Sequence, residues 1–96
     1  MNNPVIDRYG DQRWYNIDGL IHREDGPALI RAIGTQNWYK YGKIHREDGP
    51  AVIFTDNTKW WYINGKPYYN NKSYQEAAKL SDEDMNFVIL KYGDVK

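Results

Sequence analysis

The sequence contains no cysteine, and its charges cancel. Thirteen Lys and Arg residues balance thirteen Asp and Glu residues among 96, so the formal net charge is zero. The absence of cysteine excludes disulfide bonds, thiol catalysis and zinc sites built on thiolates. A neutral chain also lacks the excess of basic residues that neutralises nucleic-acid phosphates, so direct DNA binding is not expected.

Long apolar runs are absent as well. No stretch approaches the roughly 20 apolar residues that a transmembrane helix needs. Residues 1–4 read Met-Asn-Asn-Pro, which lacks the basic and apolar regions of a signal peptide. These absences predict a cytoplasmic protein without a membrane segment, and the length predicts a single domain spanning residues 1–96.

Aliphatic side chains are scarce, and aromatic side chains replace them. Leu, Ile, Val and Phe together number 19 of 96 residues, whereas the chain has nine Tyr and four Trp. Disordered chains are poor in aromatic residues, so this composition favours a folded domain. Because Trp and Tyr prefer strands and each buries a large area, the expected core is thin, aromatic and built on a sheet.

A repeat organises the first two thirds of the chain. Residues 22–28 and 45–51 both read His-Arg-Glu-Asp-Gly-Pro-Ala, an offset of 23. A Trp-Tyr pair precedes each copy and opens a third, and a glycine follows each pair. A fixed period of 20–50 residues indicates stacked supersecondary units. The tryptophans are Trp14, Trp38 and Trp61, and the glycines are Gly19, Gly42 and Gly65.

Each unit is predicted to be a β-hairpin. Residues 51–55 and 58–63 are β-rich runs, and Asn64-Gly65 is a strong hairpin turn signal. The expected fold is mainly β, an antiparallel meander of repeated hairpins over about residues 5–69. Side chains alternate along a strand, so the repeated Trp and Tyr residues should line opposite faces. The first copy has one extra residue, which predicts a bulge or a longer turn around residues 17–18.

After residue 69 the pattern becomes helical. Ser73 and Glu76 form a capping box, which predicts a first helix beginning there. Ser81 precedes three acidic residues, and Gly93 follows Lys91, which predicts a second helix with matched caps and dipole charges. We expect a short two-helix cap over about residues 73–93 that covers the end of the sheet. The alternative is that this tail forms a dimer or partner-binding face.

The motif Trp-Tyr-x-x-Gly-Lys-x-His-Arg-Glu-Asp-Gly-Pro-Ala resembles the MORN-like repeat variants of bacterial and phage proteins. The resemblance covers residues 9–68 and is clearest at 38–51. It implies an elongated antiparallel sheet used as a binding platform, in a family linked to scaffolding, dimerisation and lipid contact. Arg-Glu-Asp-Gly-Pro stands where the eukaryotic repeat has a Gly-x-Gly segment. The family has no catalytic residues to carry over to this chain.

Two duplicated features invite a chemical interpretation. His22 and His45 should lie two strands apart, about 9–10 Å, with parallel side chains, which is too far to share a zinc ion. No metal site and no cofactor are therefore expected. The acid pairs at 24–25 and 47–48 are verbatim copies, whereas a catalytic pair needs two different environments. The chain is therefore not expected to be an enzyme.

The motif residues are instead expected to build the turns and strand starts. Arg23 and Arg46 are expected to pair with acids of neighbouring repeats and so to set the register. The structural set comprises Trp14, Trp38, Trp61, His22, His45, Asp25, Asp48, Gly26, Gly49, Pro27 and Pro50.

The aromatic faces remain, and two interpretations of them are open: the tyrosines belong to a thin core, or they form a binding surface. The densest tyrosine cluster comprises Tyr39, Tyr41, Tyr62, Tyr68 and Tyr69. We expect Tyr39, Tyr41 and Tyr62 on the sheet, with Arg46 at the turn, to contact a protein partner, because Tyr and Arg are enriched at binding hot spots. The predicted function is a non-enzymatic protein-binding module. It would be a phage or mobile-element accessory protein that inhibits a bacterial host defence protein, as an anti-CRISPR does. The alternatives are a small-nucleotide binder or sponge and a structural scaffold, and a homodimer fits several of these roles.

Overall fold

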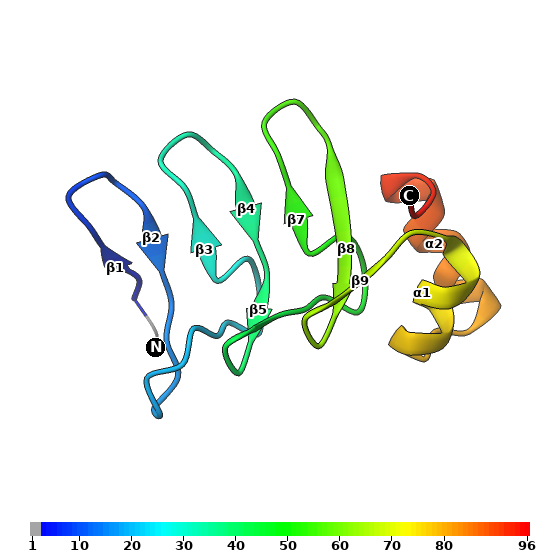
Figure 1. Cartoon of the computed structure of the whole chain (residues 1–96), viewed down its shortest axis with the longest axis horizontal. Helices are drawn as coiled ribbons and strands as arrows, with labels where there is room; N and C mark the ends of the chain where they lie inside the picture. Colours follow the sequence, from blue (N-terminus) through cyan, green and yellow to red (C-terminus); the bar gives the residue numbers. More distant parts are fainter. Residues whose placement is uncertain (1–2) are drawn as a thin grey trace.

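Three β-hairpins stand side by side in the computed structural model, which describes residues 3–96 (Figure 1). The loops that connect the two strands of each hairpin all project in the same direction, and neighbouring hairpins pair with one another. The hairpins are β1 (Val5–Ile6) with β2 (Gln12–Arg13), β3 (Leu29–Ile30) with β4 (Gln36–Asn37), and β7 (Val52–Ile53) with β8 (Lys59–Ile63).

Together with β9 (Lys66–Tyr68), these strands form a seven-stranded antiparallel sheet of order β1-β2-β3-β4-β7-β8-β9. This order confirms the predicted mainly β meander with a two-helix C-terminal cap. Each repeat contains two hairpins rather than one, because the chain turns back again below the sheet. The lower hairpins are an isolated bridge between Tyr15 and Ile21, β5 (Tyr39–Lys40) with β6 (Lys43–Ile44), and the end of β8 with β9 (Lys66–Tyr68).

The repeated tryptophan marks the point where a strand changes partner. The Trp38 amide donates to the Ala51 carbonyl of the following upper strand, and its carbonyl accepts from His45 in the lower hairpin. Trp14 makes the same two bonds, to Ala28 and His22. One backbone position therefore joins the upper and lower hairpins of a repeat.

The residue types at the lower turns explain the backbone conformation of these turns. Asn64 and Gly65 have φ angles of 51° and 81°, the left-handed pair of a type I′ turn. In the first copy the turn is longer: Gly19 donates to the Asn16 carbonyl, and the Asn16 side chain accepts from the amides of residues 18 and 20. The extra residue is therefore accommodated by a longer turn, one of the two predicted alternatives.

Two helices follow the sheet, α1 (Asn71–Ala78) and α2 (Asp82–Tyr92). The predicted capping box at Ser73 is wrong. The N-cap is Asn70, whose side chain accepts from the Ser73 amide, because Asn caps a helix at least as well as Ser and lies three residues earlier. Ser81 caps α2 as predicted, and Gly93 ends it with a φ of 90°.

The hydrophobic core lies where the helices meet the last strands. Both helices stand at the β8–β9 end of the sheet, opposite the N-terminal hairpin (Figure 1). The buried residues of this core are Trp61, Ile63, Tyr74, Ala78, Met85, Val88 and Val95. The N-terminal end has no such cover, and both residues of β1 are exposed. Burial is therefore concentrated at one end of a molecule that measures 40 × 30 × 21 Å.

Candidate functional site

The two copies of the seven-residue motif form two nearly identical loops, here called the first loop (residues 22–28) and the second loop (residues 45–51). In the first loop, Arg23 donates to Asp25 at 3.0 Å and to the Pro27 carbonyl at 3.1 Å, and its guanidinium stacks 3.9 Å from the Trp14 ring centre. The second loop repeats all three contacts at the same distances with Arg46, Asp48, Pro50 and Trp38.

The expected pairing of these arginines with acids of neighbouring repeats is therefore wrong. The aspartate two residues downstream lies within reach of the guanidinium, so Arg23 and Arg46 each close their own loop. The ion pairs between the two repeats are made instead by Lys40, whose ammonium lies 3.4 Å from Glu24 and 3.6 Å from Glu47.

The histidines join each loop to the next lower turn. Nδ1 of His22 accepts the Tyr41 amide at 2.9 Å, and Nδ1 of His45 accepts the Asn64 amide at the same distance. The ring proton of His22 therefore resides on Nε2, which donates to Glu24 at 2.6 Å. That hydrogen bond, with the nearby Lys40 charge, lowers the pKa of the Glu24 carboxyl. Both nitrogens of His22 are thus engaged by the protein itself.

Arg46 lies at the junction between the sheet and α2 rather than on a free surface. Its guanidinium donates to the Tyr92 hydroxyl at 2.8 Å, and only 12% of its side chain is exposed. It packs between the rings of Trp38 and Tyr92. We therefore leave Arg46 out of the candidate binding surface, because its functional atoms are already bound.

The second loop is covered by the helices, whereas the first loop is open. The Tyr74 hydroxyl accepts the Gly49 amide at 3.2 Å and donates towards the carbonyls of Arg46 at 2.6 Å and Gly49 at 2.9 Å. Gly49 and Pro50 are buried beneath it. Between the two loops lies an open groove of about 590 Å³, lined by Arg23, Gly26, Pro27, Trp38, Lys40 and Arg46 among others.

This difference in cover predicts different outcomes for the same substitution in the two loops. A Cβ on Gly49 would lie 2.8 Å from Cε2 of Tyr92 and 2.9 Å from Cζ of Arg46. We expect Gly49→Ala to lower the free energy of unfolding by about 1–3 kcal/mol in urea denaturation, because the packed ring must shift. The control is Gly26→Ala, whose Cβ would meet only the guanidinium end of Arg23 at 3.1 Å, with no aromatic ring packed against it. Equal losses for both variants would contradict this account.

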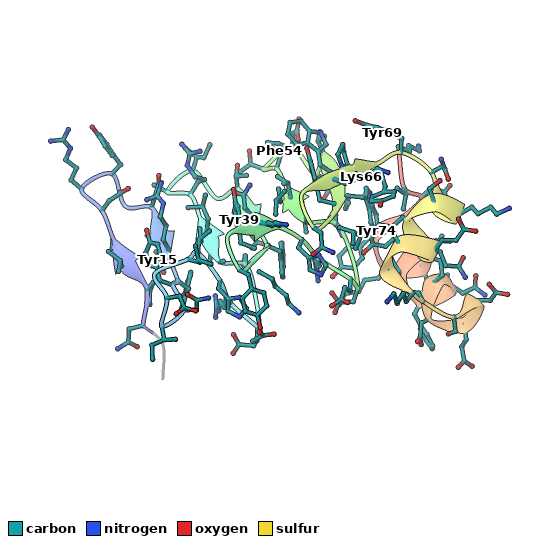
Figure 2. The ribbon with its side chains drawn as sticks, turned by 60° about the horizontal axis from the view of Figure 1, so that its bottom comes forward. Tyr15, Tyr39, Phe54, Lys66, Tyr69 and Tyr74 are labelled. Atoms are coloured by element: carbon teal, nitrogen blue, oxygen red, sulfur yellow. The ribbon has the colours of Figure 1, made fainter. Side chains whose placement is uncertain are left out.

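The repeated tyrosines lie on the face of the sheet opposite the tryptophans. Arg13, Asn37 and Trp60 lie on one face, because residues paired directly across neighbouring strands point to the same side of a sheet. Leu29 pairs with both Arg13 and Asn37, and Val52 pairs with both Asn37 and Trp60. Tyr62 lies two residues after Trp60 in β8 and shares that face. Tyr15 and Tyr39 stand at the same offset from Arg13 and Asn37, beyond the ends of β2 and β4, and extend the same alternation. We call this surface the tyrosine face: Tyr15, Tyr39, Tyr62, Trp60 and Tyr69. Figure 2 shows Tyr15, Tyr39 and Tyr69 spaced from the N-terminal hairpin towards the helices.

Exposure along the tyrosine face is partial and uneven, and it is greatest at Tyr69. Tyr15, Trp60 and Tyr69 are 39%, 48% and 71% exposed, and Tyr39 and Tyr62 are half-buried. Trp60 packs edge-on against Phe54, with ring centres 4.7 Å apart. Sequence analysis missed Trp60, although its position two residues before Tyr62 is the signal that places it on this face.

Tyr41 lies outside the tyrosine face, at the tip of the middle lower turn. It is 65% exposed and has a φ of 51°, a left-handed conformation that costs a residue other than glycine about 1–3 kcal/mol. Asn64, a residue that tolerates this conformation, occupies the equivalent position in the next repeat. The Tyr41 ring packs on His22 at 4.5 Å between centres, which offsets part of the strain.

Residues 3–96 contain no group of three His, Asp or Glu side chains placed to hold a metal ion. Neither helix in the described part of the chain is long and apolar enough to cross a membrane. In comparisons with known proteins, no family model, no curated protein and no solved structure matches the chain.

Proposed function

We propose that this chain is a non-enzymatic protein-binding module and that the tyrosine face contacts the partner. The observation that carries the proposal is the uneven cover of the sheet. The helices pack on Trp61 and Ile63, on one face of β8, while Trp60 and Tyr62 on the other face stay outside that core, Trp60 exposed and Tyr62 half-buried. Tyr and Trp are enriched at the centres of protein interfaces, where they bury a large area at low entropic cost.

We place the partner among bacterial host defence proteins. The chain would be an anti-CRISPR-like accessory protein of a phage or mobile element, acting in the cytoplasm of the host. What supports this partner class is the resemblance of the repeat to the MORN-like variants of bacterial and phage proteins. Inhibition by direct contact asks no side chain to transfer a proton, which agrees with the duplicated acids: Glu24 and Glu47 each contact a histidine and Lys40.

Alanine variants of the tyrosine face test this proposal. We expect Trp60→Ala and Tyr62→Ala each to weaken binding to a purified CRISPR effector complex by about 30-fold, the equivalent of about 2 kcal/mol at an interface hot spot. The measurement is isothermal titration calorimetry, with far-UV circular dichroism to show that the fold is kept.

Phe87→Ala provides the matched control, because Phe87 is an aromatic residue on α2 that is 66% exposed. Its binding should equal that of the unmodified chain. Loss of binding with Phe87→Ala alone would move the interface to the helical tail. A catalysed turnover that disappears with Glu24→Gln or Glu47→Gln would replace the binding module with an enzyme.

A small-nucleotide binder is the second candidate, and one feature favours it. A hollow of about 290 Å³ at the helical end of the tyrosine face is lined by Trp60, Tyr62, Tyr69 and Lys96 among others. Aromatic rings beside a cation can stack a base and attract a phosphate. Titration with nucleotides, followed by tryptophan fluorescence, separates this candidate from protein binding. A scaffold role would instead use the exposed outer strand β1, and sedimentation of the chain tests for such a homodimer.

A further inference from the structure

The first and second loops have matching internal contacts but different neighbours. Their arginines make the same three contacts at matching distances, and their histidines accept the same backbone bond from the following turn. Apart from the contact between the histidine and the glutamate, which is 2.6 Å in the first loop and 3.6 Å in the second, the two loops differ in what lies on them. The second loop therefore shows what kind of group the first loop is shaped to receive.

Tyrosine side chains of the helical cap occupy the second loop. The Tyr74 hydroxyl accepts a hydrogen bond from the Gly49 amide and donates one to the Arg46 carbonyl. The Tyr74 ring packs edge-on against Trp61, with ring centres 4.9 Å apart. A second phenol, Tyr92, binds the outer guanidinium nitrogen of Arg46. Two tyrosines from two helices thus satisfy the backbone and the arginine of this loop.

The first loop presents the same groups without an occupant. Gly26 and Pro27 are half-buried, whereas their counterparts Gly49 and Pro50 are buried. Within residues 3–96, the Gly26 amide has no counterpart of the bond that Tyr74 makes to Gly49. Trp38, the counterpart of Trp61, forms a wall of the open groove and carries the Arg46 guanidinium 3.9 Å from its ring centre, where Trp61 instead meets Tyr74.

The helices follow β9 and so stand beside the second loop, and one residue further distinguishes the surroundings of the two loops. Lys40 borders the groove at the first loop, and the equivalent position one repeat later is Ile63. Ile63 is buried in the core that holds the helices, and the Tyr74 side chain covers the second loop beside it. Lys40 instead bridges Glu24 and Glu47 at the surface, which leaves the first groove polar and accessible.

We propose that the groove at the first loop binds a tyrosine side chain presented by a helix of a partner protein, with a basic residue beside the tyrosine. The exposed charges on the rim are mainly acidic: Glu24, Asp25, Glu47 and Asp48. One of the two tyrosines at the second loop also has a basic neighbour beside an acidic residue. Lys91 precedes Tyr92 and lines a hollow together with Asp48. This groove opens between the motif loops rather than on the tyrosine face, so the inference does not depend on the function proposed above.

The probe for this site is a lactam-stapled helical peptide of about 12 residues, with one Tyr-Lys pair in an alanine background; the staple is needed because so short a helix is marginal in water. The full-length chain, labelled with ¹⁵N, is titrated by nuclear magnetic resonance. We expect saturable shifts of the Gly26 amide and the Trp38 indole, with Gly49 and Trp61 unmoved. A matched Phe-Lys peptide should bind about 3–10-fold more weakly, because it lacks the hydroxyl hydrogen bonds.

Three variants locate the site. Gly26→Leu should abolish the shifts by filling the groove, and Glu24→Gln with Glu47→Gln should weaken the Tyr-Lys peptide but not a Tyr-Gln peptide. Trp60→Ala, on the tyrosine face, should bind the probe like the unmodified chain. Equal affinity of the Tyr and Phe peptides, shifts centred on the Trp60 indole, or self-association through this groove in place of peptide binding would overturn the proposal. The peptide comparison uses the unmodified chain and holds even if Gly26→Leu fails to fold.

Discussion

Trp61→Ala is expected to lower the free energy of unfolding by about 3–5 kcal/mol, measured by urea denaturation. Only 2% of the Trp61 surface is exposed, and its ring packs against Tyr74 and Tyr92 at centre distances of 4.9 and 6.4 Å. Removing it leaves a cavity between the last strand and both helices. In a small domain with a total stability of about 5–15 kcal/mol, the loss should leave a large unfolded fraction at moderate denaturant.

The neighbouring tryptophan provides the control for this prediction. Trp60 points to the opposite face of β8 and is 48% exposed, so Trp60→Ala should cost clearly less than Trp61→Ala. The comparison holds residue type, strand and position nearly constant and changes only the face. Equal losses would mean that the tyrosine face carries as much packing energy as the core, which would contradict its assignment as a binding surface.

Tyr74→Phe is expected to lower the free energy of unfolding by about 1–3 kcal/mol, although it removes only one oxygen atom. The lost hydroxyl leaves the Gly49 amide and the Arg46 carbonyl unpaired in a buried place. The control is Tyr69→Phe, because Tyr69 is 71% exposed and its change should fall within about 0.5 kcal/mol. A Tyr74→Phe variant as stable as the parent would show that water replaces the hydroxyl.

The same hydroxyl predicts a loss of stability at alkaline pH. Burial raises the pKa of the Tyr74 hydroxyl well above its ordinary value of about 10. The folded chain therefore holds this proton more tightly than the unfolded chain does. Its contribution is fully present below about pH 10 and is lost as the pH rises above that value towards the raised pKa. The stability difference between the parent and Tyr74→Phe should accordingly shrink above pH 10, and a constant difference would contradict the burial of this group.

Sequence patterns with a local physical cause predicted their structures well. The Asn64-Gly65 turn adopts left-handed angles because those residues tolerate them, and Ser81 caps α2 because its hydroxyl reaches the amide three residues on. The repeat period predicted hairpins, and strand alternation placed Trp61 and Tyr62 on opposite faces. The first helix shows the limit of such signals, since Asn70 and Ser73 are both good caps and only the path of the chain after β9 selects Asn70.

Contacts between distant residues could not be predicted in the same way. Arg46 was expected at a binding surface, yet it donates to Tyr92, which is 46 residues away. Tyr74 had no pattern that marked it as the ligand of a loop 25 residues upstream. Both contacts depend on where the helices pack, and that position reflects the total burial of Trp61, Met85 and their neighbours rather than any single local preference.

The sequence by itself determined the two motif loops, because seven identical residues have identical local energies and so form the same turn, the same arginine stack and the same histidine bond. Only the tertiary structure decided that the second loop is covered and the first is open. That difference depends on the lower hairpin that follows each loop, which has Lys40 after the first loop and Ile63 after the second. It also depends on the helices, which bury Tyr74 and Tyr92 against the second loop. Burial of apolar area is a sum over residues distant in the chain, so identical segments can end with different neighbours.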